Sequence, residues 1–191
     1  MTHDGNNRIL IVDDNRAIHQ DFRDIFGTSK SAGLDSAKAF LLGGDDTPDT
    51  SNTYDVDSAL QGEEAVDLVN QAVETNRRYA LAFVDVRMPP GIDGVETAER
   101  IWQVDQDIQI VICTAFSDYT WTETIKRLGE TDRLLILKKP FDVVEVRQMT
   151  SALLCKWTLA RQVEWQINEL RRARVHTSVD YREAFPNLTP A

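Results

Sequence analysis

Three aspartates follow short apolar runs in this sequence. Asp13 and Asp14 come directly after RILIV (residues 8–12), and Asp85 comes directly after YALAFV (residues 79–84). If these runs are neighbouring strands of a parallel sheet, their carboxyl ends meet at one edge and the three carboxylates converge there. Two like charges about 4 Å apart cost on the order of 4 kcal/mol at an effective dielectric of about 20, so this cluster requires counter-charges.

Residues at the ends of two further apolar runs can supply the missing partners. Lys138 or Lys139 follows LLIL, and Thr114 follows IQIVIC. A divalent cation that prefers oxygen ligands, such as Mg²⁺, would add positive charge. A carboxylate nucleophile, a metal, an ammonium and a hydroxyl together are typical of a site that binds a phosphoryl group. Each residue alone is commonly a helix cap, a strand-end hydroxyl or a surface cation, so the prediction depends on the joint pattern.

The placement of these residues depends on an alternation of strands and helices. Short runs rich in Val and Ile, bounded by polar residues, are typical of buried parallel strands. The order predicts an α/β fold, a doubly wound five-stranded parallel sheet of the flavodoxin-like type, with an extended C-terminal helix. The predicted strands are residues 8–12, 54–59, 79–84, 108–113 and 134–137, and the predicted helices are 17–26, 63–75, 95–103, 119–128 and one that begins near 143.

The composition disfavours several classes of protein. The chain has 191 residues with 31 acidic and 21 basic side chains, and its net charge of −10 disfavours direct binding to nucleic acid. No apolar run approaches the roughly 20 residues of a membrane helix, and the N-terminus lacks the pattern of a secretory signal. Two cysteines cannot form a disulfide framework. We therefore expect a reduced, cytoplasmic protein that does not associate with a membrane.

Four strings of residues resemble the receiver domain of bacterial two-component response regulators, the CheY-like family. They are ILIVDDN, AFVDVRMPPGIDG, VICTA and LKKPFD, and the resemblance covers about residues 7–155. It implies that a histidine kinase or a phosphotransfer protein phosphorylates Asp85. It also implies that Asp14, Asp85 and the backbone carbonyl of Arg87 hold Mg²⁺, with Asp13 assisting through a water molecule. The chain would then be a phosphoacceptor in a phosphorelay and not an enzyme.

The resemblance also implies roles for the lysine and the threonine. It selects Lys139, because the family's lysine immediately precedes the proline, and the Lys139–Pro140 bond is often cis in this family. Thr114 becomes the switch residue, whose hydroxyl donates to the phosphoryl group. Movement of this threonine would pull the following loop inward and transmit the signal.

Three features depart from the family pattern. Ile136 stands three positions before the lysine, where the family usually has an aromatic switch residue. The string MPPGIDG is one residue longer than usual between its proline and its Asp-Gly. Residues 27–53 form an insertion after the first helix, rich in Gly, Ser, Thr, Asp and Pro. We predict a peripheral surface elaboration with one short helix over 36–42, in preference to a ligand-binding lid.

The last helix is predicted to continue beyond the receiver over residues 156–176, followed by a tail over 177–191 without periodicity. Its apolar residues recur with heptad spacing, which predicts a coiled coil and a homodimer. The alternative is one long helix that packs its apolar side on its own receiver. The predicted seam consists of Val146, Met149, Leu153, Ala160, Val163, Ile167 and Leu170, and it is interrupted at Lys156.

The sequence leaves the output of the receiver open. The residues after the receiver are too few for a DNA-reading domain, so the chain is a stand-alone regulator, an intermediate that passes its phosphoryl group onward, or the N-terminal module of a larger histidine kinase or cyclic-dinucleotide enzyme. The sequence disfavours two other classes of protein. A phosphatase with an aspartate nucleophile needs a second Asp two residues later, where this chain has Arg87. An interaction module that works without phosphorylation would keep the fold and lose parts of the site.

Overall fold

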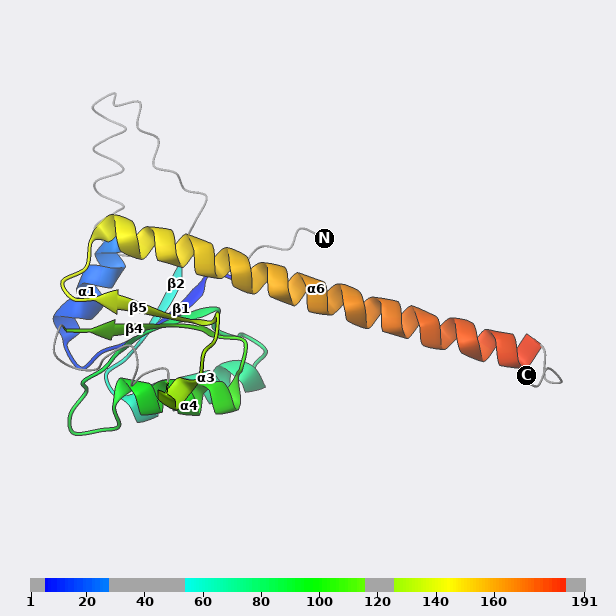
Figure 1. Ribbon diagram of the computed structural model, residues 1–191, viewed down its shortest axis with the longest axis horizontal. Helices are drawn as coiled ribbons and strands as arrows, with labels where there is room; N and C mark the ends of the chain where they lie inside the picture. Colours follow the sequence, from blue (N-terminus) through cyan, green and yellow to red (C-terminus); the bar gives the residue numbers. More distant parts are fainter. Residues whose placement is uncertain (1–5, 28–53, 116–125, 185–191) are drawn as a thin grey trace, which may run out of the picture. The chain divides into compact units, whose positions relative to one another are not determined.

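The computed structural model describes residues 6–27, 54–115 and 126–184, with backbone only for 173–184 (Figure 1). Its centre is a sheet of five parallel strands in the order β2-β1-β3-β4-β5. This confirms the predicted fold class, and every strand lies within two residues of its predicted position. The strands are β1 (Arg8–Val12), β2 (Asp55–Ala59), β3 (Leu81–Asp85), β4 (Gln109–Thr114) and β5 (Leu134–Lys138).

Four helices are described: α1 (Arg16–Ile25), α3 (Gly62–Glu74), α4 (Gly94–Val104) and α6 (Val143–Ala184). Side chains at alternate strand positions point to opposite faces of the sheet, and each face has its own apolar core. Leu10 on β1 belongs to the core that α3 and α4 cover, and its neighbour Ile9 belongs to the core that α1 and the first part of α6 cover. The strands are therefore buried on both faces, which explains their continuous apolar runs.

Two predicted segments fall mainly outside the described residues. Of the predicted helix over 119–128, only residues 126–128 are described, and these are helical. Of the insertion over 27–53, only Gly27 is described. Gly27 lies two residues after the last residue of α1 and has a positive φ of 68°, a conformation in which glycine carries no steric penalty.

Helix α6 takes part in two compact units, residues 1–157 and 158–191. In the first unit, Val146 is fully buried and Leu153 is 4% exposed in the receiver core. In the second unit, Val163 is 52% exposed and Leu170 is 72% exposed. The predicted continuous coiled-coil seam from 146 to 170 is therefore wrong in its first half. Those residues cover the sheet of their own domain, as the alternative reading expected.

The predicted end of this helix at residue 176 is also wrong, because α6 continues to Ala184. The first residue that opposes a helix in this region is Pro186. Proline restricts the residue before it as well as itself, so a helix can run to residue 184 without a clash. In the described part of the chain, no helix combines the length and the apolar character needed to cross a membrane.

Candidate functional site at the carboxyl edge of the sheet

The carboxyl ends of four strands bring the predicted site residues to one edge. Asp13 follows β1, Asp85 is the last residue of β3, Thr114 is the last residue of β4 and Lys139 follows β5. The strands are in register there, since Asp85 pairs with Cys113. The backbone N–H of Lys139 also donates to the Thr114 carbonyl at 2.8 Å. Parallel pairing therefore places polar side chains from distant parts of the sequence beside one another.

Lys139 lies between two carboxylates. Its Nζ is 2.7 Å from Asp13 Oδ2 and 2.5 Å from Asp85 Oδ1. The side chains of Asp13 and Asp85 are only 3% and 11% exposed, and that of Lys139 is 22% exposed. The Lys139–Pro140 bond is cis. Of the two candidate lysines, the structure brings Lys139 to the acids, whereas Lys138 is exposed.

The environment of Asp85 favours its protonated form relative to an aspartate in water. Burial raises the pKa of Asp85, and the nearby charge of Asp13 raises it further, while the hydrogen bond and charge of Lys139 oppose this shift. The backbone N–H of Arg87 donates to Asp85 Oδ2 at 3.0 Å and also favours the carboxylate. Burial alone would lower the pKa of Lys139, but its bonds to Asp13 and Asp85 raise it. The ammonium therefore keeps its proton while it holds the two acids.

The turn after β1 is contacted by a helical residue that the sequence patterns did not indicate. His19 on α1 is 3% exposed, and its Nε2 lies 2.7 Å from the backbone carbonyl oxygen of Asp13. The Asp13 carboxylate accepts from the backbone N–H of Asn15 at 2.9 Å. His19 lies one turn before Phe22 on the buried face of α1, so helical periodicity could have shown its burial.

Asp14 and Arg87 are exposed, whereas Thr114 is buried at the end of β4. Asp14 is exposed, and among residues 6–27, 54–115 and 126–184 no three acidic, histidine or cysteine side chains are grouped as a metal site would require. The Thr114 hydroxyl donates to the carbonyl of Ala115 at 2.9 Å. Asp13 and Asp85, which Lys139 brings together, nonetheless offer carboxylate oxygen atoms, and these are the ligands that Mg²⁺ prefers.

Known proteins with similar sequences include response regulators. A family model of the response regulator receiver domain matches residues 49–151. The chain is 28% identical over 149 residues to sporulation initiation phosphotransferase F of Bacillus subtilis (strain 168), which covers 78% of this chain and 94% of that protein. It is 29% identical over 147 residues to response regulator MprA of Mycobacterium sp. (strain KMS), over 77% of this chain and 50% of that protein. The chain thus spans about half the length of the second relative.

A solved structure gives the same result for the fold. The signal receiver domain of an HD domain-containing protein from Pseudomonas fluorescens Pf-5 superposes with a TM-score of 0.61 at 18% identity, over 85% of this chain and 96% of that one. The family model matches residues 49–151, which come after β1 and α1, but β1 lies between β2 and β3 in the same sheet. Because the family model matches more than half of the chain, the chain belongs to the response regulator receiver domains of two-component systems.

Proposed function

We propose that this receiver accepts a phosphoryl group on Asp85 from a histidine kinase or a phosphotransfer protein. The observation that supports the proposal most is the contact of Lys139 with both Asp13 and Asp85 at the carboxyl edge of the sheet. In the proposed step, a carboxylate oxygen of Asp85 forms a bond to phosphorus, and the bond between phosphorus and the donor's imidazole nitrogen breaks. The released imidazole takes up a proton, and the chain retains an acyl phosphate.

Receiver domains of this family generally use Mg²⁺. In this chain, Asp13, Asp14, Asp85 and the Arg87 carbonyl would hold the ion. When bound, Mg²⁺ draws negative charge from the carboxylate and from the phosphoryl oxygens. Because Lys139 carries the only positive charge in direct contact with these acids in the described part of the chain, we infer that the metal and the lysine share the neutralisation.

Lys139 and Thr114 respond to the new group after transfer. The Lys139 ammonium exchanges a carboxylate oxygen of Asp85 for a phosphoryl oxygen, which keeps a charge-assisted bond. The Thr114 hydroxyl leaves the Ala115 carbonyl and donates to another phosphoryl oxygen. This exchange pulls on the chain directly after β4, which is how phosphorylation changes the surface that partners read. The partly buried residue on β5 at position 136 is Ile136. Because it is not aromatic, the movement of Thr114 proceeds here without an aromatic side chain at that position.

Intact-protein mass spectrometry tests the acceptor. We expect acetyl phosphate with Mg²⁺ to add one phosphoryl group to the wild-type chain and none to Asp85→Asn. Asp67→Asn is the matched control, because Asp67 is exposed on α3 and away from this edge. A label that persists in Asp85→Asn would show that another residue is the acceptor. A wild-type chain that takes no phosphoryl group under any donor would favour an interaction module that works without phosphorylation.

We further propose that two copies of the chain associate through α6 beyond Trp157. Leu159, Val163, Ile167 and Leu170 are 56%, 52%, 43% and 72% exposed, and their spacing places them on one side of the helix. Leaving them in water forgoes roughly 1.5 to 3 kcal/mol for each side chain. A second copy presents the same stripe, and a two-fold pair covers both stripes at once.

Light scattering tests the assembly. We expect a dimeric mass for the wild-type chain and a monomeric mass for the double substitution Val163→Ser with Ile167→Ser. Trp165→Ser is the control, because Trp165 is equally exposed, at 55%, but lies on the opposite side of the helix. A wild-type monomer at all accessible concentrations would remove the proposal.

The predicted cytoplasmic location stays a prediction from the sequence.

A further inference from the structure

The longer loop between β3 and α4 receives a contact from another part of the chain. The side-chain amide of Gln61 binds two of its backbone groups. Gln61 Oε1 accepts from the N–H of Gly91 at 3.2 Å, and Gln61 Nε2 donates to the carbonyl of Pro89 at 3.4 Å. One amide therefore fixes two loop residues in the string MPPGIDG, which is where the sequence has one residue more than the family pattern.

Gln61 makes these contacts instead of capping its own helix. It is the N-cap residue of α3, in an extended conformation with φ −143° and ψ 156°, and its side chain makes no cap hydrogen bond. N-cap positions usually carry a short polar side chain that accepts from the first turn. Just before the helix, the Glu64 carboxylate accepts from the N–H of Leu60 at 2.7 Å. A poor capping residue at this position is explained by its contact with the loop.

Glycines keep the loop and this corner close together. A Cβ on Gly91 would lie 2.4 Å from Gln61 Oε1 and 2.8 Å from Glu63 Oε2. A Cβ on Gly62 would lie 2.1 Å from Thr97 Oγ1 and 2.5 Å from Ile92 Cγ1. All four distances are far shorter than real side-chain contacts. The start of α3 is therefore packed directly against residues 91–97.

The same loop carries Arg87 and begins directly after Asp85, the last residue of β3. At its base, the N–H of Gly94 donates to the carbonyl of Val86 at 2.9 Å, and the N–H of Arg87 donates to the Asp85 carboxylate. At its tip, Gln61 holds Pro89 and Gly91. The backbone carbonyl of Arg87 lies between these two attachments, so its position depends on both.

We propose that Gln61 is a positioning residue for the phosphoacceptor loop, which holds the Arg87 carbonyl where a divalent cation can use it. This inference rests on the proposed function of Asp85. It assigns to the β2–α3 corner a part in metal binding, although Gln61 touches neither the acceptor nor the metal.

The experiment measures phosphorylation by acetyl phosphate as a function of Mg²⁺ concentration in the full chain. Loss of a residue that orients a metal ligand typically weakens metal affinity by about 10-fold or more. We expect Gln61→Ala to raise the half-saturating Mg²⁺ concentration by about 10-fold, with most of the rate recovered at saturating Mg²⁺. Gln61→Glu keeps an acceptor for Gly91 but loses the donor to Pro89, so its shift should be smaller.

Gln71→Ala is the matched control, since Gln71 is an exposed glutamine on the same helix and should leave the Mg²⁺ dependence unchanged. A half-saturating concentration in Gln61→Ala equal to that of the wild type would overturn the proposal. Hydrogen exchange of the Gly91 amide gives a second readout that needs no phosphorylation. The Gly91 N–H is shared between Gln61 Oε1 and the Met88 carbonyl, at 3.1 Å, and its exchange should be faster in Gln61→Ala, which loses the first of these acceptors. If the wild type takes no phosphoryl group, the proposed function fails, while unchanged Gly91 exchange would separately refute the role of Gln61.

Discussion

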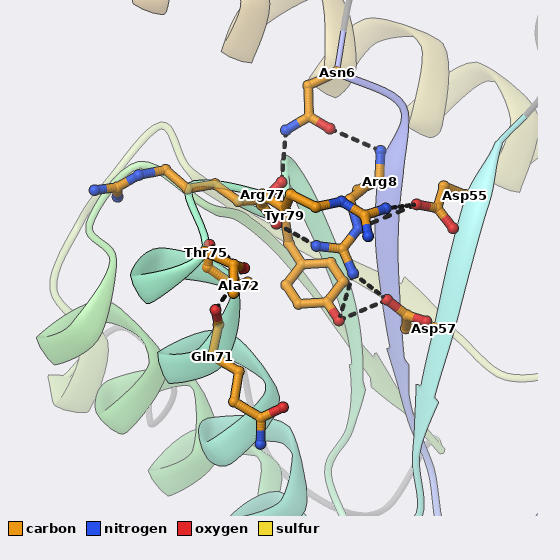
Figure 2. Close-up of polar contacts among 10 residues, drawn as sticks. Asn6, Arg8, Asp55, Asp57, Gln71, Ala72, Thr75, Arg77 and Tyr79 are labelled. Carbon is orange, nitrogen blue, oxygen red and sulfur yellow. Dashed lines mark hydrogen bonds and ion pairs between the residues drawn. The ribbon is translucent and has the colours of Figure 1, made fainter.

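The two ends of the sheet both carry clusters of charged side chains, but their charges sum differently. At the carboxyl edge, Asp13 and Asp85 contact the single cation Lys139, and Asp14 lies next along the chain. At the amino edge, which Figure 2 shows, Arg8 pairs with Asp55 at 3.2 Å.

The amino-edge cluster is balanced. Arg8 also pairs with Asp57, Arg77 lies 3.2 Å from Asp55, and the hydroxyl of Tyr79 donates to Asp57 at 2.7 Å (Figure 2). The guanidinium of Arg8 lies over the Tyr79 ring, 4.2 Å from its centroid. Two cations thus face two carboxylates, and the polar groups bind one another.

The difference in net charge separates an edge that stabilises the fold from an edge that can bind a cation. A network in which cations and carboxylates are equal in number rigidifies the fold and leaves no excess charge to neutralise. An edge with more acids than cations has a net negative charge, and a divalent cation can neutralise it. Composition alone does not separate the two clusters, because both consist of Asp with a basic partner.

Removing Lys139 or Arg8 should have the largest effect. In metal-free buffer, we expect Lys139→Met to lower the free energy of unfolding by about 3 kcal/mol, because two buried carboxylates lose their partner. Arg8→Met should cost less, because Asp55 and Asp57 are 51% and 39% exposed and water can solvate them. Urea unfolding with and without Mg²⁺ is the measurement.

The response to Mg²⁺ separates the two variants. We expect Mg²⁺ to recover much of the lost stability in Lys139→Met, because the metal binds the folded state and takes the place of the ammonium charge. It should recover little in Arg8→Met. Equal recovery in both variants would contradict the contrast between a binding edge and a structural edge.

The same substitution, Asp to Asn, should act in opposite directions at the two edges. Asp57→Asn removes the charged acceptor of Arg8 and Tyr79, and we expect a loss of about 1 to 2 kcal/mol. Asp14→Asn removes one of the excess negative charges, and without metal we expect unchanged or slightly higher stability, within about 0.5 kcal/mol. Isothermal titration should show weaker Mg²⁺ binding for Asp14→Asn only. Unaltered Mg²⁺ affinity in that variant would show that the metal is held elsewhere.

Much of the carboxyl edge could be predicted, because each strand is a short apolar run in the sequence and polar residues show where it ends. Runs of Val and Ile locate β1, β3 and β4, and parallel pairing then brings the residues after them together. The sequence alone did not distinguish Lys138 from Lys139, since both follow the apolar run LLIL. The resemblance selected Lys139, and the contacts with Asp13 and Asp85 agree with that choice.

What escaped prediction depends on contacts between segments. Gln61 looks like an ordinary residue before a helix, and only the folded chain shows its amide on Pro89 and Gly91. The heptad pattern of α6 failed for a related reason. Periodicity tells which side of a helix is apolar, but it does not tell whether the same domain or another molecule covers that side. Val146 and Val163 obey one spacing and lie in different surroundings.

The smallest effect concerns the hydroxyl of Tyr79, which completes the balanced network. Burial raises the pKa of this phenol above its ordinary value of 10.0, and the hydrogen bond to Asp57 and that residue's charge raise it further, while the charge of Arg8 lowers it. Folding therefore favours the protonated phenol. The stabilisation by the hydroxyl is complete below the unfolded pKa, and it is lost as the pH rises from there towards the folded pKa, because the unfolded chain releases the proton first.

We expect Tyr79→Phe to be about 1 kcal/mol less stable than the wild type at neutral pH, and we expect this difference to shrink in urea unfolding above a pH of about 10. The remaining titrating groups are common to both proteins, so they cancel in the difference. A gap between the two proteins that stays constant or widens at alkaline pH would show that the hydroxyl does not hold its proton through Asp57.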